Sequence, residues 1–289
     1  MMSDLIQANF IPLFIDWKVD SQLIDGLKTP NLYGLLFVSG LIIGFYLMKR
    51  IYQNENIPEK QLDKLVLFVV ISTIVGARLG HVFFYGPYYG PDGYLTNPQN
   101  IIKVWEGGLA SHGAAVAILL SLWYYSKYII QKPFLWILDR ISPSIAIAGC
   151  FIRLGNLVNH EIVGDPTDVP WAFKFHYYFN EKIMNFDPTP RHPAQLYESI
   201  CYLISFAVLY YMFFKLEKFK QPGYVFGFFL IFIFGARFLV EFVKLTQTSN
   251  DNAILTSTGL NTGQWLSVPL VLTGLHLVYR SFRSKETIT

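Results

Sequence analysis

The chain has 289 residues, of which 53% are hydrophobic, 17% aromatic and only 15% charged, and its formal net charge is +3. Soluble domains contain about 25% charged residues, so this composition excludes an ordinary soluble protein of the same length. The small net charge gives no support for a nucleic-acid partner, and two cysteines are too few for a disulfide scaffold. The composition therefore predicts a protein embedded in a lipid bilayer.

Seven apolar stretches are long enough, or nearly long enough, to cross a bilayer. A helix needs about 20 apolar residues to span a hydrocarbon core about 30 Å thick. In chain order the predicted spans are 31–48, 65–85, 107–128, 141–159, 195–214, 224–243 and 264–279. Because the runs are continuous and do not alternate, we expect an all-α polytopic bundle of about seven transmembrane helices and not a strand barrel.

Lysine and arginine are unevenly distributed between the ends of these spans. They are dense in four short stretches, at 49–64, 127–140, 215–220 and 280–285. Cytoplasmic connections carry an excess of basic residues, so we expect the N-terminus outside and the C-terminus in the cytoplasm.

We expect a single integral membrane domain over residues 1–289. Residues 1–30 are predicted to lie at the outer interface, where the apolar stretch 6–17 is too short to cross the membrane. The loops 86–106 and 160–194 are long and rich in aromatic residues, which suits the headgroup layer of the outer face.

Ionisable side chains lie inside several predicted spans, although insertion scales assign each a cost of several kcal/mol. Arg78, His112, Arg153 and Arg237 all lie about 7 to 10 Å from the outer end of their span at a rise of 1.5 Å per residue. This common depth indicates one positive cavity that is open toward the outer leaflet. Because arginine binds phosphate through a bidentate fork, we expect an anionic phospholipid as the ligand.

Each of these residues also has a purely structural interpretation. Arg237 and Glu241 are four residues apart and can form a salt bridge on one helix face, whereas Arg78 can act as a clamp between helices. His112 can pack between helices, and Asn156 can hydrogen-bond to a neighbouring helix. The shared depth of the set favours a functional interpretation.

Two other classes of membrane protein would fit a positive cavity. A transporter or lipid-binding protein would bind an anionic solute there, but transporters often contain internal repeats and we find none in this sequence. A membrane acyltransferase or glycosyltransferase would fit the cavity but not the ordered motifs that follow.

Six ordered segments carry a family resemblance. The longest is FIRLGNLVNHEIVG at 151–164, and the others are LYGL at 32–35, GARLG at 76–80, GGLASHG at 107–113, RHPAQLYE at 191–198 and RFLVEF at 237–242. As a set, over residues 31 to 280, they resemble the prolipoprotein diacylglyceryl transferase family.

The resemblance implies an enzyme of the bacterial inner membrane with its active site toward the outer leaflet. Such enzymes transfer the diacylglyceryl group of phosphatidylglycerol to the lipobox cysteine thiol of preprolipoproteins, forming a thioether and releasing glycerol phosphate. The implied partners are phosphatidylglycerol, the lipobox segment of the signal peptide and the bilayer. We expect no metal and no cofactor, because no set of histidines has the spacing of metal ligands.

The matched motifs and the chemistry together define a candidate site. Residues of the family's motifs are Tyr33, His112, Arg153, Asn156, Glu161, Gly164, Arg237 and Glu241. We expect Arg153 and Arg237 to bind the lipid phosphate, supported by Asn156, Tyr33, Arg78 and Gly164. The charge of the leaving phosphate must be stabilised as the C–O bond breaks, and we expect Glu241 to orient Arg237.

The substrate thiol must also lose its proton, because the thiolate is the nucleophile. His112 is the preferred base, since an imidazole can accept a proton near neutral pH. Glu161 and Glu241 are alternatives that the sequence leaves open.

Three positions depart from the family pattern. Ile152 and His160 stand where glycine is usual, and Ile233 stands where a tyrosine is common. A role for that tyrosine cannot be carried over to this chain.

Overall fold

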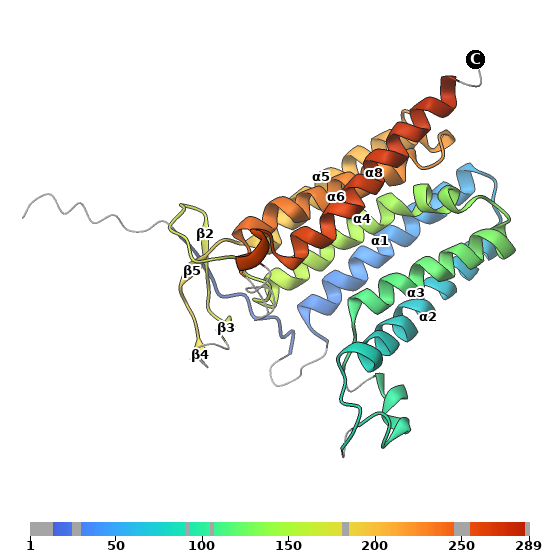
Figure 1. The fold of residues 1–289 in the computed structure, drawn as a ribbon. Helices are drawn as coiled ribbons and strands as arrows, with labels where there is room; N and C mark the ends of the chain where they lie inside the picture. The colour runs from blue at the N-terminus through green and yellow to red at the C-terminus, as the bar shows by residue number, and fades with distance from the viewer. Residues whose placement is uncertain are drawn as a thin grey trace, which may run out of the picture. The chain divides into compact units, whose positions relative to one another are not determined.

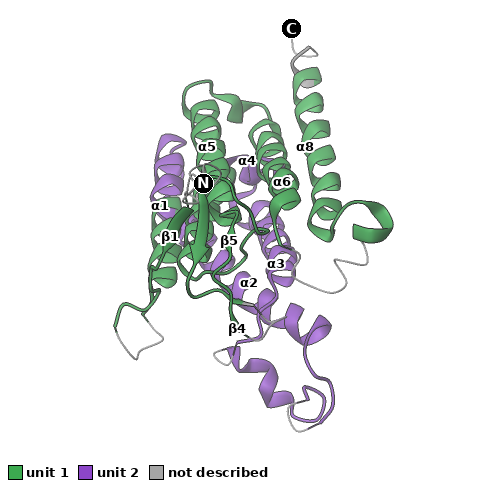
Figure 2. Cartoon of the chain, turned by 90° about the vertical axis from the view of Figure 1, so that its left-hand side faces the viewer, with its two compact units in different colours: residues 1–44, 142–289 green, residues 45–141 purple. Residues whose placement is uncertain are grey.

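A computed structural model of the chain describes residues 14–24, 30–90, 93–104, 107–180, 185–245 and 255–286. The described chain is dominated by helices (Figure 1). It divides into two compact units, one formed by Met1–Gly44 with Ser142–Thr289 and the other by Phe45–Ile141 (Figure 2). Most of the predicted interfacial stretch 6–17 lies outside the described residues.

Among the described helices, six are long and apolar enough to cross a membrane, which confirms the predicted all-α membrane fold. These are α1 (Leu32–Asn54), α2 (Glu59–Phe84), α3 (Ser111–Tyr124) with the π-helical turn η3 (Tyr125–Ile130), α4 (Phe134–Val158), α5 (Ala194–Phe214) and α6 (Tyr224–Val240) with the 3-10 turn η5 (Glu241–Val243). The seventh predicted span forms helix α8 (Thr262–Glu286), which is long enough but less apolar than the other six.

Two helices start earlier than their apolar runs suggest. Helix α2 begins at Glu59 and α4 at Phe134, six and seven residues before the predicted starts. In the added turns of α4, Arg140 Nη2 lies 2.6 Å from Glu55 Oε1. A charged residue can therefore continue a helix near the membrane edge when it has a counter-ion.

Glycines allow close helix contacts within each unit. In the unit of residues 45–141, a Cβ added at Gly113 of α3 would lie 2.3 Å from the carbonyl oxygen of Gly76 in α2. In the other unit, a Cβ added at Gly274 of α8 would lie 2.6 Å from the carbonyl oxygen of Gly227 in α6. Small residues at such crossings let helix backbones approach closely in membranes.

A three-stranded and a two-stranded sheet involve the segment that follows the C-terminal end of α4. Strand β2 (Ala172–Phe175) pairs in parallel with β1 (Phe14–Trp17) and antiparallel with β5 (Pro190–Arg191), and β3 (Phe179–Asn180) pairs antiparallel with β4 (Asn185–Phe186). Trp17 Nε1 donates a hydrogen bond to the Leu157 carbonyl at 3.1 Å, which joins the three-stranded sheet to α4. The sequence analysis expected only a loop at 160–194, so these short strands were missed. Two short 3-10 turns, η1 (Pro98–Ile102) and η4 (Lys218–Lys220), lie in other connections.

Candidate active site

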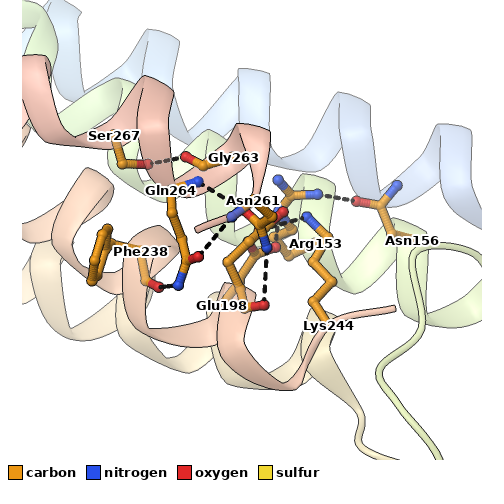
Figure 3. A network of polar contacts seen from close by, with 10 residues as sticks. Arg153, Asn156, Glu198, Phe238, Lys244, Asn261, Gly263, Gln264 and Ser267 are labelled. Atoms are coloured by element: carbon orange, nitrogen blue, oxygen red, sulfur yellow. Dashed lines mark hydrogen bonds and ion pairs between the residues drawn. The ribbon is translucent and has the colours of Figure 1, made fainter. Parts of the chain in front are cut away.

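Arg153, near the C-terminal end of α4, is held by a buried carboxylate of α5. Its Nε lies 2.6 Å from Oε2 of Glu198, whose side chain is 0% exposed. Its Nη1 donates a hydrogen bond to Oδ1 of Asn156 at 3.0 Å, one turn further along α4 (Figure 3). Two of the three guanidinium nitrogens therefore fix the orientation of Arg153.

The polar contacts continue from Asn156 toward solvent. Asn156 is buried, and its Nδ2 donates to Oε1 of the exposed Glu161 at 2.8 Å. Because Asn156 lies between a cation and an anion, its amide oxygen must face Arg153 and its amide nitrogen Glu161. Gln195 Nε2 donates to the Glu161 carbonyl at 2.5 Å and holds the backbone of this residue. The result is a continuous chain of contacts from buried Glu198 to exposed Glu161.

Tyr33, at the start of α1, packs against this chain of contacts. A Cβ added at Gly155 would lie 2.7 Å from the Tyr33 ring, so the glycine makes room for the tyrosine. Tyr33 is also an electrostatic neighbour of Glu161 and Arg153. The structure therefore brings Tyr33, Arg153, Asn156 and Glu161 together, as the sequence predicts.

The expected pair between Arg237 and Glu241 does not form in the described part of the chain. Helix α6 ends at Val240, and Glu241 begins the 3-10 turn η5. Glu241 Oε2 lies 3.1 Å from Nζ of Lys244, the extended residue that follows η5. The Glu241 N–H still donates to the Arg237 carbonyl, so the helical spacing of the two residues is kept, but the Glu241 carboxylate lies against Lys244 instead. The direct pair through which Glu241 was expected to orient Arg237 is therefore not formed among the described residues.

Arg237 keeps its hydrogen-bonding capacity. Its side chain is partly exposed, and its buried Nε has no hydrogen-bond partner among the residues that the structure describes. No ion pair of Arg237 occurs among these residues either. Its charge interacts with Tyr202, and Tyr202 also interacts with Arg153.

The charges of this cluster are more balanced than the sequence suggests. Arg153, Arg237 and Lys244 are accompanied by three carboxylates, those of Glu161, Glu198 and Glu241. The predicted positive excess is therefore not a property of the whole cluster. It is local to Arg237, the member of the cluster that lacks an ion pair within the described ranges.

Arg78 lies in the other compact unit and has a different environment. It is buried, and its guanidinium donates to the backbone carbonyls of Ile101 at 2.8 Å, Gly107 at 2.7 Å, Gly108 at 3.2 Å and Asn100. Four carbonyl acceptors satisfy most of its donors, so this geometry favours the clamp interpretation. The clamp joins α2 to the 3-10 turn η1 and to the backbone just before α3.

A polar cavity of about 210 Å³ lies beside Arg78. It is lined by Arg78, His81, Pro87, Tyr94, Asn100, Gly107 and Gly108. The Tyr94 ring centroid is 5.3 Å from Arg78 Cζ, a distance typical of a cation–π contact.

His112 lies in the same unit as Arg78, in the first turn of α3. Its side chain is exposed and has no hydrogen-bond partner in the described ranges of the chain. The close contact at Gly113 fixes the backbone next to it.

Gly164 joins the loop after α4 to the end of α6. Its N–H donates to the His192 carbonyl at 2.9 Å, and an added Cβ would lie 2.6 Å from both that oxygen and the Val243 carbonyl. The next residue, Asp165, donates its N–H to Val243 at 2.9 Å. Gly164 thus permits a backbone contact next to Glu241, and lipid binding by Gly164 remains a prediction.

Two of the sequence departures have structural explanations. His160 has a φ of +55°, a region that favours glycine, and its Nε2 contacts the Val19 carbonyl at 2.8 Å while Tyr177 N–H donates to Nδ1 at 3.4 Å. Burial lowers the pKa of His160. Ile233 packs against the buried cluster that contains Tyr202. Nothing in the structure explains Ile152.

Sequence reasoning missed several residues of the site. Glu198 was inside a quoted motif, and its only signal was a carboxylate in the first turn of a predicted span. Lys244 follows the sixth predicted span and belongs to none of the quoted motifs, although its side chain is only 7% exposed. Asn261 and Gln264, at the start of α8, contact each other and the end of α6 (Figure 3), and no motif pointed to them.

Comparison with known proteins identifies close relatives. Residues 24–280 match the sequence model described as prolipoprotein diacylglyceryl transferase. The phosphatidylglycerol–prolipoprotein diacylglyceryl transferase of Tolumonas auensis is 44% identical over 270 residues, covering 93% of this chain and 98% of the relative. The proteins of the same name from Porphyromonas gingivalis and Chloroherpeton thalassium are 41% and 40% identical, covering 96% and 94% of this chain and 98% and 96% of the relatives.

Proposed function

The chain belongs to the prolipoprotein diacylglyceryl transferase family, and we propose that its active site is the cluster around Arg153, Glu198 and Arg237. The protein transfers the diacylglyceryl group of phosphatidylglycerol to prolipoproteins, the first step of lipoprotein maturation. It is a multi-pass protein of the inner membrane. The acceptor in our proposal is the lipobox cysteine thiol.

The position of the cluster along the helices supports one membrane face for the site. Arg153 lies near the end of α4, Glu198 in the second turn of α5 and Arg237 near the end of α6. Because successive spans alternate in direction, these three positions share one side of the bilayer. With the N-terminus outside, as the basic residues predict, that side is the outer leaflet.

Arg237 binds the phosphate of phosphatidylglycerol in this proposal. The observation that carries it is the contrast between two arginines: Arg153 is paired with Glu198, whereas Arg237 has no ion pair among the described residues and is partly exposed. A guanidinium with free donors can bind two phosphate oxygens at once. Arg153, fixed by its neighbours, borders the phosphate and limits its position.

The reaction is a displacement at the glycerol carbon that carries the phosphate. The thiolate sulfur forms a bond to this carbon, and the C–O bond to phosphate breaks with its electron pair going to oxygen. The phosphate thereby gains one negative charge, and Arg237 stabilises this charge as it develops. The products are a thioether and glycerol phosphate.

His112 accepts the thiol proton in this proposal. A free cysteine has a pKa near 8.5 and an unperturbed imidazole one near 6.5, so the transfer is feasible near neutral pH. The exposed imidazole without a hydrogen-bond partner in the described chain has a lone pair available. Glu241 is less suited because Lys244 compensates its charge. Glu161 remains the alternative base.

Substitution of Arg237 tests the site directly. Purified protein in detergent is incubated with labelled phosphatidylglycerol and a lipobox peptide, and label on the peptide cysteine is measured. We expect Arg237→Gln to lose transfer, while Lys220→Gln, an exposed cation of η4 that pairs with Glu217, keeps it. Full transfer by Arg237→Gln would remove Arg237 from the mechanism.

A further inference from the structure

The carboxylate of Glu241 lies directly against Gly263, in the first turn of α8. A Cβ added at Gly263 would lie 2.5 Å from Oε1, 2.6 Å from Cδ and 3.1 Å from Oε2 of Glu241. Gly263 is not among the glycines with positive φ, so its backbone conformation is open to any residue. An added methyl group at this position would therefore have to displace the Glu241 carboxylate, whereas the backbone would accept it.

The turn that carries Gly263 is fixed by a reciprocal pair of hydrogen bonds. Gln264 N–H donates to Oδ1 of Asn261 at 2.9 Å, and Asn261 N–H donates to Oε1 of Gln264 at 3.0 Å (Figure 3). This is a capping box with Asn261 as N-cap and Gln264 at the third helical position. Asn261 and Gln264 are both buried, so the first turn of α8 is well ordered around Gly263.

The two amide groups of the capping box also hold the end of α6. Asn261 Nδ2 donates to the backbone carbonyl of Glu241 at 3.2 Å, and Gln264 Nε2 donates to that of Phe238 at 3.4 Å. The last carbonyls of a helix lack hydrogen-bond donors within the helix. Here Asn261 and Gln264, at the start of α8, supply two of these donors to the end of α6. The backbone of Glu241 is thereby linked to the turn that contacts its side chain.

We infer that Gly263 is a positioning residue that holds the Glu241 carboxylate toward Lys244 and away from Arg237. Glu241 lies 3.1 Å from Lys244 Nζ and is an electrostatic neighbour of Arg153. A larger residue at 263 would displace the carboxylate, and a carboxylate that reached Arg237 would compete with the lipid phosphate for its donors. This inference rests on the phosphate-binding role proposed for Arg237.

The test is Gly263→Ala in the full-length protein, with Gly44→Ala as the matched control. Both changes add one methyl group to a helix, but the methyl at Gly44 makes ordinary contact, 3.5 Å from Ser144. Transfer is assayed with phosphatidylglycerol and a lipobox peptide. We expect Gly263→Ala to raise the KM for phosphatidylglycerol and to lower kcat/KM about tenfold or more, since a displacement near 1 Å can cost up to about 100-fold, while Gly44→Ala stays near wild type.

Thermal unfolding provides a readout that does not depend on activity. Alanine is a better helix former than glycine, so a lower Tm for Gly263→Ala would report the contact with the carboxylate. In a Glu241→Ala background the same change should no longer lower the Tm, as a double-mutant cycle requires for residues in contact. Relief by Glu241→Ala is expected even if Gly263→Ala alone fails to fold.

The outcomes separate the two proposals. Wild-type kcat/KM for Gly263→Ala, or an equal Tm decrease in both backgrounds, would overturn the positioning role. If instead the Tm coupling is present and Arg237→Gln is fully active, the phosphate-binding proposal fails while the contact itself stands. The role inferred for Gly263 in catalysis then fails with it.

Discussion

Glu198 and Arg153 form an ion pair of 2.6 Å between neighbouring helices, with the carboxylate removed from solvent. Removing one partner of such a buried pair costs much more stability than replacing both partners by apolar residues, because it leaves an uncompensated buried charge. The pair explains how an arginine stays inside the bundle. It also makes Glu198 the residue on which the geometry of Arg153 depends.

We therefore predict that Glu198→Gln destabilises the protein and impairs transfer. Breaking a buried pair typically costs about 3–5 kcal/mol of unfolding free energy. The matched control is Glu217→Gln, which removes the carboxylate of an exposed pair with Lys220 and should cost less than about 1 kcal/mol. Equal unfolding midpoints for the two variants in detergent would contradict a structural role for the buried pair.

Arg153→Lys should not preserve function, although it keeps the charge. Arg153 contacts Glu198 through Nε and Asn156 through Nη1, and a lysine ammonium cannot reproduce this planar fork. We expect kcat/KM to fall at least about 100-fold, in line with the cost of misplacing a positioning group, and Arg153→Gln to abolish transfer. Near-normal kinetics of Arg153→Lys would show that the geometry of the fork is not needed.

The base is tested by a comparison of His112→Ala with Glu161→Gln. Loss of a general base typically reduces the rate by about 10² to 10⁴. We expect a loss of this size for His112→Ala and a smaller loss for Glu161→Gln. The reverse order would assign the proton transfer to Glu161.

His160 should make the stability of the segments that follow β1 and β2 depend on pH. Its neutral ring contacts Val19 through Nε2 and accepts from Tyr177 at Nδ1, and burial lowers its pKa. In the unfolded chain the histidine has a pKa near 6.5, so as the pH falls it binds a proton before the folded His160 does. The contribution of His160 to the free energy of unfolding is therefore complete above about pH 6.5 and is lost below it.

Limited proteolysis near Val19 across pH 5 to 8 measures this effect. We expect cleavage to increase at acidic pH in the wild type and to be independent of pH in this range in His160→Gly, whose positive φ suits glycine. The groups that face His160 electrostatically are His176 and Asp20, so Asp20→Asn serves as the control. Unchanged cleavage of the wild type would show that His160 does not titrate in this way.

The membrane helices could be predicted because a span must contain about 20 apolar residues, a length that few other structures need. The three-stranded sheet could not be predicted, because its short strands depend on pairing between β1 and β2, about 160 residues apart in the chain. Tyr33, Arg153, Asn156 and Glu161, which the family motifs grouped, lie together in the structure. The Arg237–Glu241 pair does not form among the described residues, although the helical spacing is kept, because the Glu241 carboxylate pairs with Lys244 instead.

The partner of Arg153 illustrates the same limit. Helical periodicity relates residues three or four apart, but Glu198 is on another helix and 45 residues further along the chain. The contacts of Arg78 with a loop depend on backbone carbonyls, which no side-chain pattern reports.

The central claim is that Arg237 binds the phosphate of the lipid substrate. A structure determined with bound phosphatidylglycerol tests it most directly. We predict a phosphate oxygen about 2.7–3.2 Å from a guanidinium nitrogen of Arg237, a normal hydrogen-bond distance. A phosphate bound instead in the cavity beside Arg78, with no lipid oxygen near Arg237, would contradict the account.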